Sequence, residues 1–260
     1  MQKPIQHKAN NWVDGMKLSS AHFVATDQYI ADTNRDNAAI TLNEFNYGLL
    51  PAFAGYDNSF DIDIQKKSTN YLEVNVRYCN AITADGIRID ITSKQSDGQL
   101  HLNAYLDTNQ LAVGPHFIVL FVDPLKRIPT GEPNPEESPL RYPEVVKEYS
   151  IGLVSPSDLK QRLTADHFLP IGQIIHENGQ TEVNSSYVIP TAMMKSHTFL
   201  VQHHNSWYAS LILLQQAAFK IMDKTSAKDK ITNLGINIRG ISDKMLQHFS
   251  STFFYYRHIL

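Results

Sequence analysis

The hydrophobic pattern of this 260-residue chain changes its period near residue 190, and that change limits the folds it can adopt. Before that point apolar and polar residues alternate; in Leu72–Tyr78 every second residue is apolar. A period of two buries one face of a strand and wets the other, which is typical of antiparallel sheets. After residue 190 the apolar residues recur at spacings of three and four, the period of a helix. We therefore predict a mixed β + α protein, with an N-terminal antiparallel β-sandwich over 41–190 and a long helical hairpin over 191–260.

Turn residues divide the alternating region into short strands. Asp85–Gly86 and Asp97–Gly98 stand between successive apolar runs, as hairpin turns require. Phe117–Val122 is continuously apolar and is predicted to be a central strand. Pro124–Pro139 contains five prolines, and we expect an exposed loop without regular pairing there. Several short strands with such turns favour a sandwich.

Residues 1–40 are predicted to form an arm followed by a helix over Ala21–Asn37. Ser19 or Ser20 can cap this helix, because a serine oxygen accepts an unpaired amide of the first turn. Tryptophan and methionine are enriched in interface cores, so this region is our candidate partner-binding site. The alternative is an N-terminal strand that seals an edge of the sandwich. The candidate residues are Trp12, Asp14, Gly15, Met16, His22 and Phe23.

The segment after Pro190 carries one apolar or aromatic seam on each of two predicted helices, separated by a break at Lys224–Lys230. Alternating spacings of four and three over about four heptads are typical of a coiled coil. A lone hairpin cannot cover both seams, so we expect copies of the chain to pack together. The first seam is Met193, His197, Leu200, His204, Trp207, Leu211, Leu214, Ala218 and Ile221, and the second is Ile231, Leu234, Ile238, Ile241 and Met245.

The seam histidines allow two readings. In a threefold assembly His197 and His204 would each form a ring of three, which is a candidate metal or anion site. The alternative is a polar layer that fixes register and oligomer number. His203 points off that face and cannot complete a ligand set from its own helix. We predict no metal. The residues predicted to join the protomers are His197, Leu200, His204, Trp207, Leu211, Leu214, Ala218, Ile221, Ile238, Ile241 and Met245.

Composition excludes several classes of function. The net charge of −3 gives no electrostatic reason to bind nucleic acid. Apolar runs such as Leu211–Leu214 are too short to cross a bilayer, and Met1–Pro4 lacks a signal-peptide core. The single cysteine, Cys79, excludes an internal disulfide and is expected to be a core residue. We find no phosphate-binding loop, metalloprotease helix or nucleophile elbow, and predict a cytoplasmic protein without catalytic residues or cofactor.

The order of these segments resembles the TssK family, the trimeric baseplate component of bacterial type VI secretion systems. Asn11–Phe23 resembles the family's opening, with its tryptophan, Gly-Met pair and His-Phe pair entering a helix. Ala84–Gly86 resembles a family turn, and Leu140–Tyr142 its Arg-aromatic segment. Phe168–Gly172 resembles its Leu-Pro-Ile strand, and Tyr187–Pro190 its entry to the helical neck.

The resemblance implies a homotrimer whose shell domain, here 41–190, binds the wedge proteins TssF and TssG, and whose neck is 191–260. It implies no catalysis. Family members commonly carry a C-terminal head that docks to the inner-membrane complex, and we expect no such docking from a sequence that ends at Leu260. Two other hypotheses remain: a phage-tail-like receptor- or glycan-binding protein with the same architecture, and a metal-dependent enzyme that uses the histidine seam.

Overall fold

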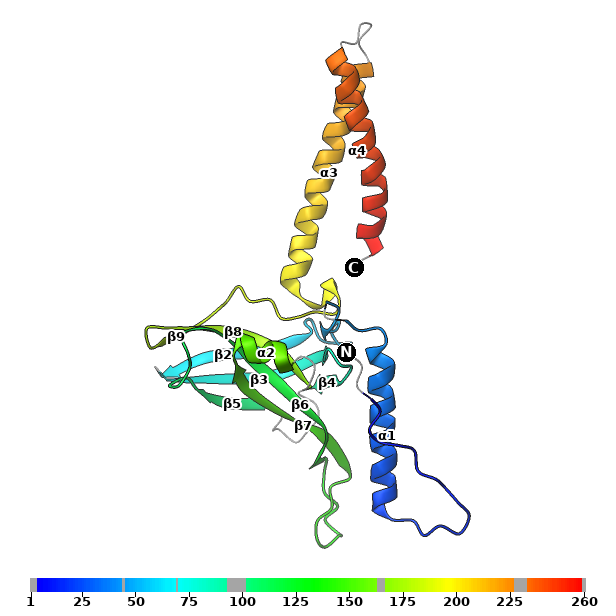
Figure 1. Ribbon diagram of the computed structural model, residues 1–260, viewed down its shortest axis with the longest axis vertical. Coiled ribbons are helices and arrows are strands. Elements are labelled where there is room, and N and C mark those ends of the chain that lie inside the picture. Colours follow the sequence, from blue (N-terminus) through cyan, green and yellow to red (C-terminus); the bar gives the residue numbers. More distant parts are fainter. Residues whose placement is uncertain are drawn as a thin grey trace. The chain divides into compact units, whose positions relative to one another are not determined.

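The computed structural model describes residues 4–258, with gaps at 44, 69, 93–101, 163–166 and 227–232. The chain divides into two compact units, Met1–Ala192 and Met193–Leu260. The first unit holds helix α1 (Ser20–Ala39) and two antiparallel sheets, and the second is built of helices (Figure 1). The mixed β + α fold class predicted from the change of period is therefore confirmed.

The first sheet is organised around one long strand, β3. Strand β2 pairs along one edge of β3, and β4 and β5 pair in succession with the other edge, while β1 pairs with its last two residues. The alternation of Leu72, Val74 and Val76 with polar residues places all three side chains in the core. The strands are β1 (Gly48–Leu49), β2 (Phe60–Ser68), β3 (Tyr71–Ile82), β4 (Arg88–Ile91) and β5 (Leu102–Asp107).

The second sheet has the order β7-β6-β8-β9 and is antiparallel throughout. The short helix α2 (Pro156–Arg162) covers its outer face, where Leu159 packs against Val119 and Phe168. The continuous apolar run at Phe117–Val122 is explained by this arrangement, because the strand is covered on both faces. The strands are β6 (Gly114–Thr130), β7 (Glu144–Val154), β8 (Phe168–Glu177) and β9 (Gln180–Val183).

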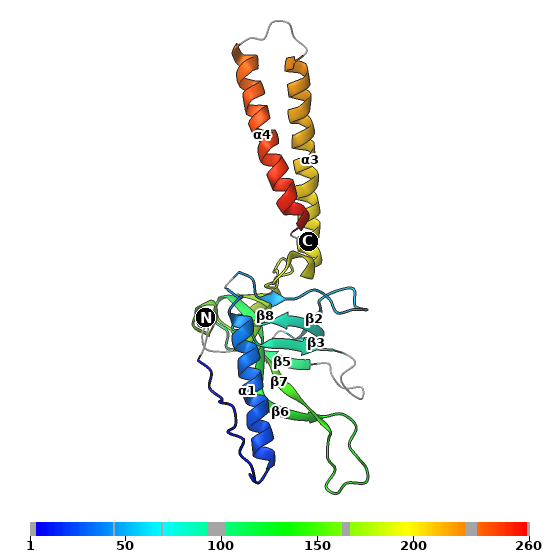
Figure 2. The same cartoon turned by 90° about the vertical axis from the view of Figure 1, so that its right-hand side faces the viewer.

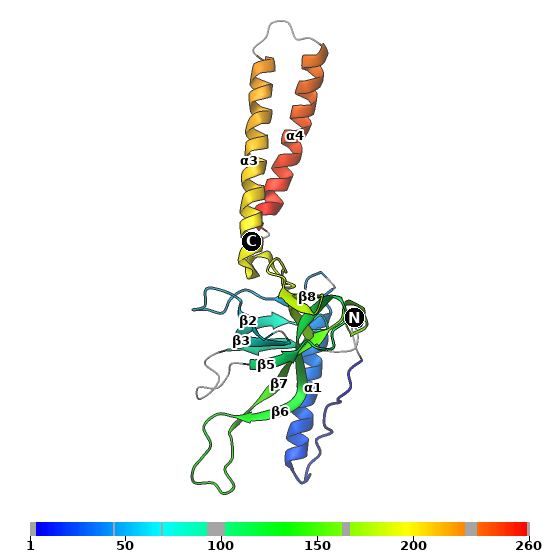
Figure 3. The ribbon, with the colours of Figure 1, turned by 90° about the vertical axis from the view of Figure 1, so that its left-hand side faces the viewer.

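The inner faces of the two sheets share one hydrophobic core, which confirms the predicted sandwich. Leu72 and Val74 of the first sheet belong to the same cluster of buried residues as Leu120 and Ile174 of the second. The sheets approach so closely at Gly172 that a Cβ there would lie 3.0 Å from Cδ1 of Ile64. Figure 3 shows the two sheets stacked face to face.

The predicted loop at Pro124–Pro139 is wrong in its first half. Strand β6 continues to Thr130 and pairs with β7 again from Arg127, after an irregularity at residues 124–126 that contains Pro124. Pro129 is tolerated because β6 has only one neighbour along this stretch, so its missing N–H interrupts no second ladder. The strands β6 and β7 extend beyond the rest of the sandwich as a ribbon (Figure 3).

The turn between β3 and β4 is the predicted Asp85–Gly86 turn, closed by a hydrogen bond from the Thr83 N–H to the Ile87 carbonyl. Gly86 has φ +95°, and a Cβ there would lie 2.4 Å from the Arg35 carbonyl oxygen. The C-terminal end of α1 therefore sits directly on this turn, and only glycine fits the contact. The other predicted turn, Asp97–Gly98, lies outside the described residues.

The second unit contains a short 3-10 helix, η1 (Met194–Ser196), and two long helices, α3 (Thr198–Ser226) and α4 (Asn233–His258). The two helices pack against each other as the hairpin that the period of three and four predicted. The predicted seam residue Ile231 and most of the predicted break, Lys224–Lys230, lie outside the described residues. Among the described residues, no helix combines the length and the hydropathy needed to cross a membrane.

Candidate interaction surfaces

The N-terminal arm is fastened to α1 by one buried carboxylate, Asp32. The backbone N–H groups of Gln6 and His7 donate to its Oδ2 at 2.8 and 2.9 Å, and Arg35 Nη1 lies 3.3 Å from Oδ1. Burial raises the pKa of Asp32, but the two amide hydrogen bonds, the His7 side chain and Arg35 outweigh it and lower that pKa overall. Residues 4–19 contain no strand, so the alternative of a strand sealing the sandwich edge is wrong. Figure 2 shows the arm running beside α1.

The predicted partner-binding residues lie at the far end of this arm and in the first turn of α1. Asp14–Gly15 form a turn with Gly15 at φ +77°, closed by the Met16 N–H and the Val13 carbonyl. Trp12 is 50 % exposed and Phe23, in the first turn of α1, is 56 % exposed, while Met16 is half-buried. The arm and the helix thus present apolar side chains together at one tip.

His22 has a local structural task at the same tip. Ser19, one of the two serines expected to cap α1, is its N-cap, and its backbone N–H donates to His22 Nδ1 at 3.2 Å. The His22 carbonyl accepts a hydrogen bond from Asn10 Nδ2 at 2.6 Å, which fixes the arm to the first turn. The imidazole lies 6.0 Å from the Trp12 ring. His22 therefore positions Trp12 and the helix start at once.

Burial on α1 is inverted relative to an ordinary amphipathic helix. Its only buried residues are the charged pair Asp32 and Arg35, whereas Phe23, Ile30 and the following Ile40 are exposed. A surface helix normally turns its apolar stripe toward the core. Exposed apolar residues over such a length are typical of a surface that a partner covers.

The hairpin has an inner seam that differs from the predicted one. The shielded positions of α3 recur at spacings of four and three, and those of α4 that face them are small or polar except for Leu246 and Phe249. Leu200, His204, Leu211 and Ala218 of the predicted seam are shielded, whereas Trp207, Leu214 and Ile221 are exposed. The inner-seam positions are Val201, His204, Tyr208, Leu211, Gln215, Ala218, Met222 and Thr225 on α3 and Gly235, Ser242, Leu246, Phe249 and Thr252 on α4, and Leu200 and Ile212 beside them are also half-buried.

Several exposed apolar residues lie on one side of the hairpin, whereas Phe219 and Ile236, which come one residue after inner-seam positions, are exposed on the opposite side. Trp207, Leu214 and Ile221 each come one residue before an inner-seam position of α3, and Leu234 and Ile241 do so on α4. One residue rotates the position by about 100° round an α-helix. Because two antiparallel helices are related by a twofold axis across the hairpin, the same rotation brings both stripes to the same side. We call this surface the hairpin apolar side; Leu214 is 49 % and Ile241 60 % exposed.

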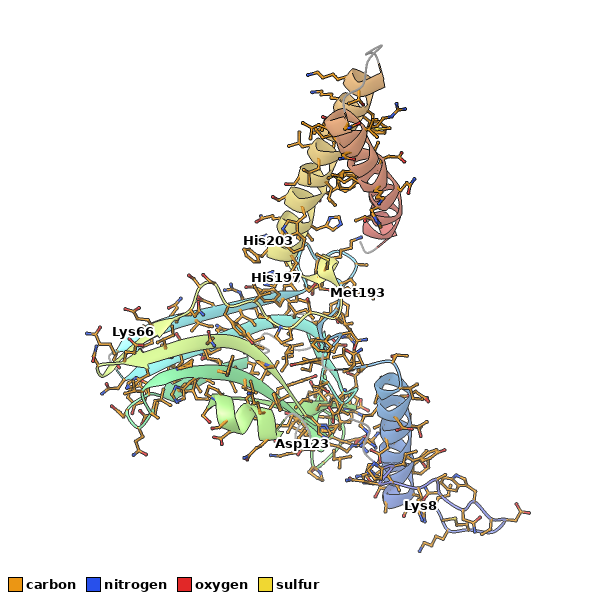
Figure 4. All side chains as sticks on the ribbon, turned by 45° about the horizontal axis from the view of Figure 1, so that its top comes forward. Lys8, Lys66, Asp123, Met193, His197 and His203 are labelled. Carbon is orange, nitrogen blue, oxygen red and sulfur yellow. The ribbon has the colours of Figure 1, made fainter. Side chains whose placement is uncertain are left out.

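Aromatic side chains continue this surface toward the start of α3. His203 stacks edge-on against Phe199, with ring centroids 4.3 Å apart, and lies 5.9 Å from the Trp207 ring. His197 precedes the helix, and burial lowers its pKa, which favours its neutral form. Figure 4 labels His197 and His203 at the start of α3. His203 thus takes part in an aromatic row, although its position was predicted to lie off the seam.

A hydrogen-bonded pair of residues far apart in the sequence, His167 and Asp85, connects β8 to the β3–β4 turn. His167, at the start of β8, lies with its Nδ1 2.5 Å from Oδ2 of the buried Asp85, and the Thr83 hydroxyl donates to Oδ1 at 2.6 Å. The β3–β4 turn thereby contacts both β8 and the end of α1. Sequence reasoning found the turn but not its partner, which is 82 residues away.

The outer face of the first sheet carries two exposed tyrosines, Tyr71 and Tyr105, diagonally opposite on neighbouring strands. Tyr105 donates from its hydroxyl to Glu73 Oε1 at 2.9 Å, and Lys67 Nζ lies 2.7 Å from the other oxygen. Hydrogen bonds from Lys67, Asn103 and Tyr105 lower the pKa of Glu73 to about 2. This is an ordered polar surface with aromatic rings on it.

The described residues contain no group of three or more side chains of the kinds that ligate metals, placed so that they could hold an ion. Cys79 is fully buried, as expected of a core residue, and burial raises its pKa to about 12, so it stays a neutral thiol at physiological pH. In the described part of the second unit, no aspartate or glutamate therefore joins His197, His203 and His204 in a group that could hold a metal ion.

The fold defined here, an antiparallel sandwich followed by a helical hairpin, matches solved structures, although no family model and no curated protein sequence matches the chain. A crystal structure of TssK covers 97 % of this chain with a TM-score of 0.61 at 12 % identity. A baseplate complex from the type VI secretion system covers 98 % with a TM-score of 0.57, also at 12 % identity. The resemblance to TssK is thus confirmed in the fold. The chain spans 56 % and 57 % of the lengths of those two matched chains.

Proposed function

We propose that this chain is a structural adaptor of a type VI secretion baseplate, located in the cytoplasm, with no catalytic activity. The observation that carries the proposal is that nearly the whole chain, sandwich and hairpin together, shares the TssK fold. Exposed apolar surface on the arm tip, on α1 and on the hairpin supports an assembly role, because such surface is typical of protein interfaces.

In this proposal the protomers form a homotrimer through the hairpin. The hairpin apolar side supplies Trp207, Leu214, Ile221 and Ile241, all of them residues that the sequence assigned to oligomerisation. A surface formed by both helices suits a bundle of several hairpins, since each helix then has one neighbour within its protomer and others across the interface. Residues 1–40 and 41–190 act as arm and shell, and 191–260 as the neck.

The arm tip and the shell bind the wedge proteins TssF and TssG. Trp12, Met16 and Phe23 supply apolar contact surface, Asp14 and Gly15 form the turn that presents them, and His22 holds Trp12 in place. Tryptophan at the centre of an interface commonly contributes 2 kcal/mol or more, roughly, to binding.

Paired substitution Trp12→Ala and Met16→Ala tests the wedge contact. Co-purification of TssF and TssG with the tagged chain is expected to fall below detection, while the oligomeric mass and the unfolding midpoint stay unchanged, because both side chains lie outside the sandwich core. Val113→Ala, which removes an exposed apolar side chain between β5 and β6, away from the arm and α1, is the matched control. Undiminished capture by the double variant would show that the arm is not the binding surface.

The alternative function is a phage-tail-like receptor- or glycan-binding protein. The specific observation in its favour is the pair Tyr71 and Tyr105 on the polar outer face of the first sheet, because aromatic rings beside carboxylate and amide groups suit sugar binding. Binding to a glycan array that is lost on replacing Tyr105 with alanine would favour this alternative. Equal signals from the wild type and the variant would dismiss it.

A further inference from the structure

A groove runs between α1 and the edge of the sandwich within the first unit. Its main part has a volume of about 430 Å³, and a smaller part of about 140 Å³ continues it along the helix past Asp27 and Ala31. The walls are apolar over much of their area, with Ile30 on α1 facing Ile82 and Ile87 of the sandwich. This volume suits a few side chains and is far too small for a folded domain.

The groove is lined by more cations than anions. Five lining residues are basic and one is acidic; the set is Arg35, Arg88, Lys126, Arg127, Lys147 and Asp27. Three of the cations have a carboxylate partner, because Arg35 pairs with Asp32, Arg127 with Asp27 and Lys126 with Glu148.

Arg88 and Lys147 have no carboxylate within ion-pair distance in the described part of the chain. Arg88 Nη1 donates to the Ala81 and Ile89 carbonyls at 2.8 and 3.2 Å, and Lys147 Nζ donates to the Arg88 carbonyl at 2.8 Å. Asp90 is the one acidic group whose field reaches both. Two half-buried cations therefore share a single carboxylate and face an open groove.

This arrangement disfavours the charged forms of both side chains. Burial lowers the pKa of Lys147, and the neighbouring Arg88 lowers it further; burial also lowers the pKa of Arg88. Desolvated cations are stable in proteins when an anion with good geometry accompanies them. An added carboxylate would accept the remaining Nζ protons of Lys147, which carries three donors and uses one for the Arg88 carbonyl.

We propose that the groove binds an extended acidic segment of a protein partner, with an aspartate or glutamate placed against Lys147 and Arg88 and an apolar side chain beside Ile30 and Ile87. The charge imbalance selects the carboxylate, and the apolar walls select the neighbouring residue. The partner's place in the assembly rests on the proposed function, but the chemistry of the groove does not.

The test uses the full chain and a display library of random twelve-residue peptides, so it requires no wedge protein. Enriched peptides are expected to contain an acidic residue next to an apolar one, and replacing the acid by its amide is expected to weaken binding at least tenfold. Carbodiimide coupling of a bound peptide to the wild-type chain, read by mass spectrometry, is expected to join the peptide carboxylate to Lys147.

Lys147→Met together with Arg88→Met is expected to cause the same tenfold loss, and Lys67→Met together with Arg77→Met, whose cations pair with Glu73 and Asp61 outside the groove, is the matched control. If the double variant unfolds, two results still decide the question: peptide binding by Lys147→Met alone, and the lysine to which the peptide is coupled in the wild-type chain. Peptides without acidic residues, coupling at other lysines only, unchanged binding by Lys147→Met, or binding of inorganic phosphate with no acidic peptide enriched would each overturn the proposal. Failure to capture TssF and TssG would instead count against the proposed function alone.

Discussion

The sandwich and the hairpin bury their apolar residues in opposite ways. The sandwich encloses its large aliphatic side chains between two sheets, so Leu120 and Ile174 are fully buried within one chain. The hairpin closes its inner seam with residues such as Ala218, Gln215 and Ser242 and leaves Leu214 and Ile241 in water. The first unit therefore has a core of its own, whereas the second leaves most of its large apolar side chains exposed. We interpret the sandwich as the scaffold and the hairpin as the assembling element.

Charges on the hairpin apolar side should have the largest effect. Leu214→Asp with Ile241→Asp removes two apolar side chains per protomer, each contributing about 1.5–3 kcal/mol when buried in an interface, and introduces charge that is costly to bury. We expect the oligomer to dissociate into folded monomers, measured by light scattering and circular dichroism. Gln216→Asp with Gln247→Asp adds the same charge away from that side and should leave the oligomer intact. Dissociation by both pairs would show a general charge effect.

Truncation in the sandwich core should be nearly as severe but should act on folding itself. Leu120→Ala is expected to lower the free energy of unfolding by about 2–5 kcal/mol, because it leaves a cavity between the sheets. Leu214→Ala removes the same atoms from the hairpin and should change the unfolding of the isolated protomer by less than about 0.5 kcal/mol. Urea titration of the two variants at a concentration low enough for the chain to be monomeric measures both. Equal decreases in the free energy of unfolding for Leu120→Ala and Leu214→Ala would contradict the proposed difference between the two units.

The contact between α1 and the sandwich should be sensitive at one glycine. Gly86→Ala places a side chain in the left-handed region, at a cost of about 1–2 kcal/mol, and against the Arg35 carbonyl oxygen. We expect a lower thermal midpoint and faster hydrogen exchange at the end of α1. Gly179 also has a positive φ, but it has open space around it, so Gly179→Ala carries the conformational cost without the clash. Equal decreases in the thermal midpoint of Gly86→Ala and Gly179→Ala would mean that the structure relieves the clash at residue 86.

Loosening the arm by a substitution at Asp32 should have the smallest effect on the free energy of unfolding of the whole chain. Asp32→Asn weakens the charge-assisted hydrogen bonds from the Gln6 and His7 amides, worth about 1 kcal/mol or slightly more in net terms. We expect faster hydrogen exchange of those amides without a change in the sandwich. Thr33→Ala, which removes only a half-buried hydroxyl hydrogen bond to the Tyr29 carbonyl within α1, is the control. If the Gln6 and His7 amides remain protected from hydrogen exchange in Asp32→Asn, contacts other than Asp32 hold the arm in place.

The same carboxylate gives the arm a pH dependence with a defined sign. Because the pKa of Asp32 is lower in the folded chain than its ordinary value of 3.8, its ionised form favours the docked arm. The docking energy is fully present above pH 3.8 and is lost as the pH falls through the lowered value. Amide exchange of Gln6 and His7 measured down this range would follow that loss, and Asp32→Asn should remove the dependence.

Periodicity predicted the elements of this fold because burial on one face is a local property of the sequence. It located β3 from Leu72, Val74 and Val76 and the two long helices from their seams. It failed for the last part of β6, because a stretch with only one neighbouring strand tolerates Pro129. It also merged two helix faces into one seam, because positions one residue apart both carry apolar side chains.

The contacts that shape the candidate surfaces were not predictable in the same way. Asp32 meets the arm 25 residues before it, and Asp85 meets His167 82 residues after it, so no local pattern marks either pair. Lys147 reads as one polar residue of a strand, and only the packing of β7 beside Arg88 makes it a half-buried cation in a groove. Trp12 and Met16 could be named as candidates from the sequence because their residue types are unusual in an exposed arm.

The solution mass of the wild-type chain tests the central claim most directly. Light scattering at micromolar concentration should give three times the 29.4 kDa of the chain, because the hairpin apolar side is covered only when protomers associate. A mass of one chain under the same conditions would contradict the account, since the exposed residues of α3 and α4 would then have no copy to pack against.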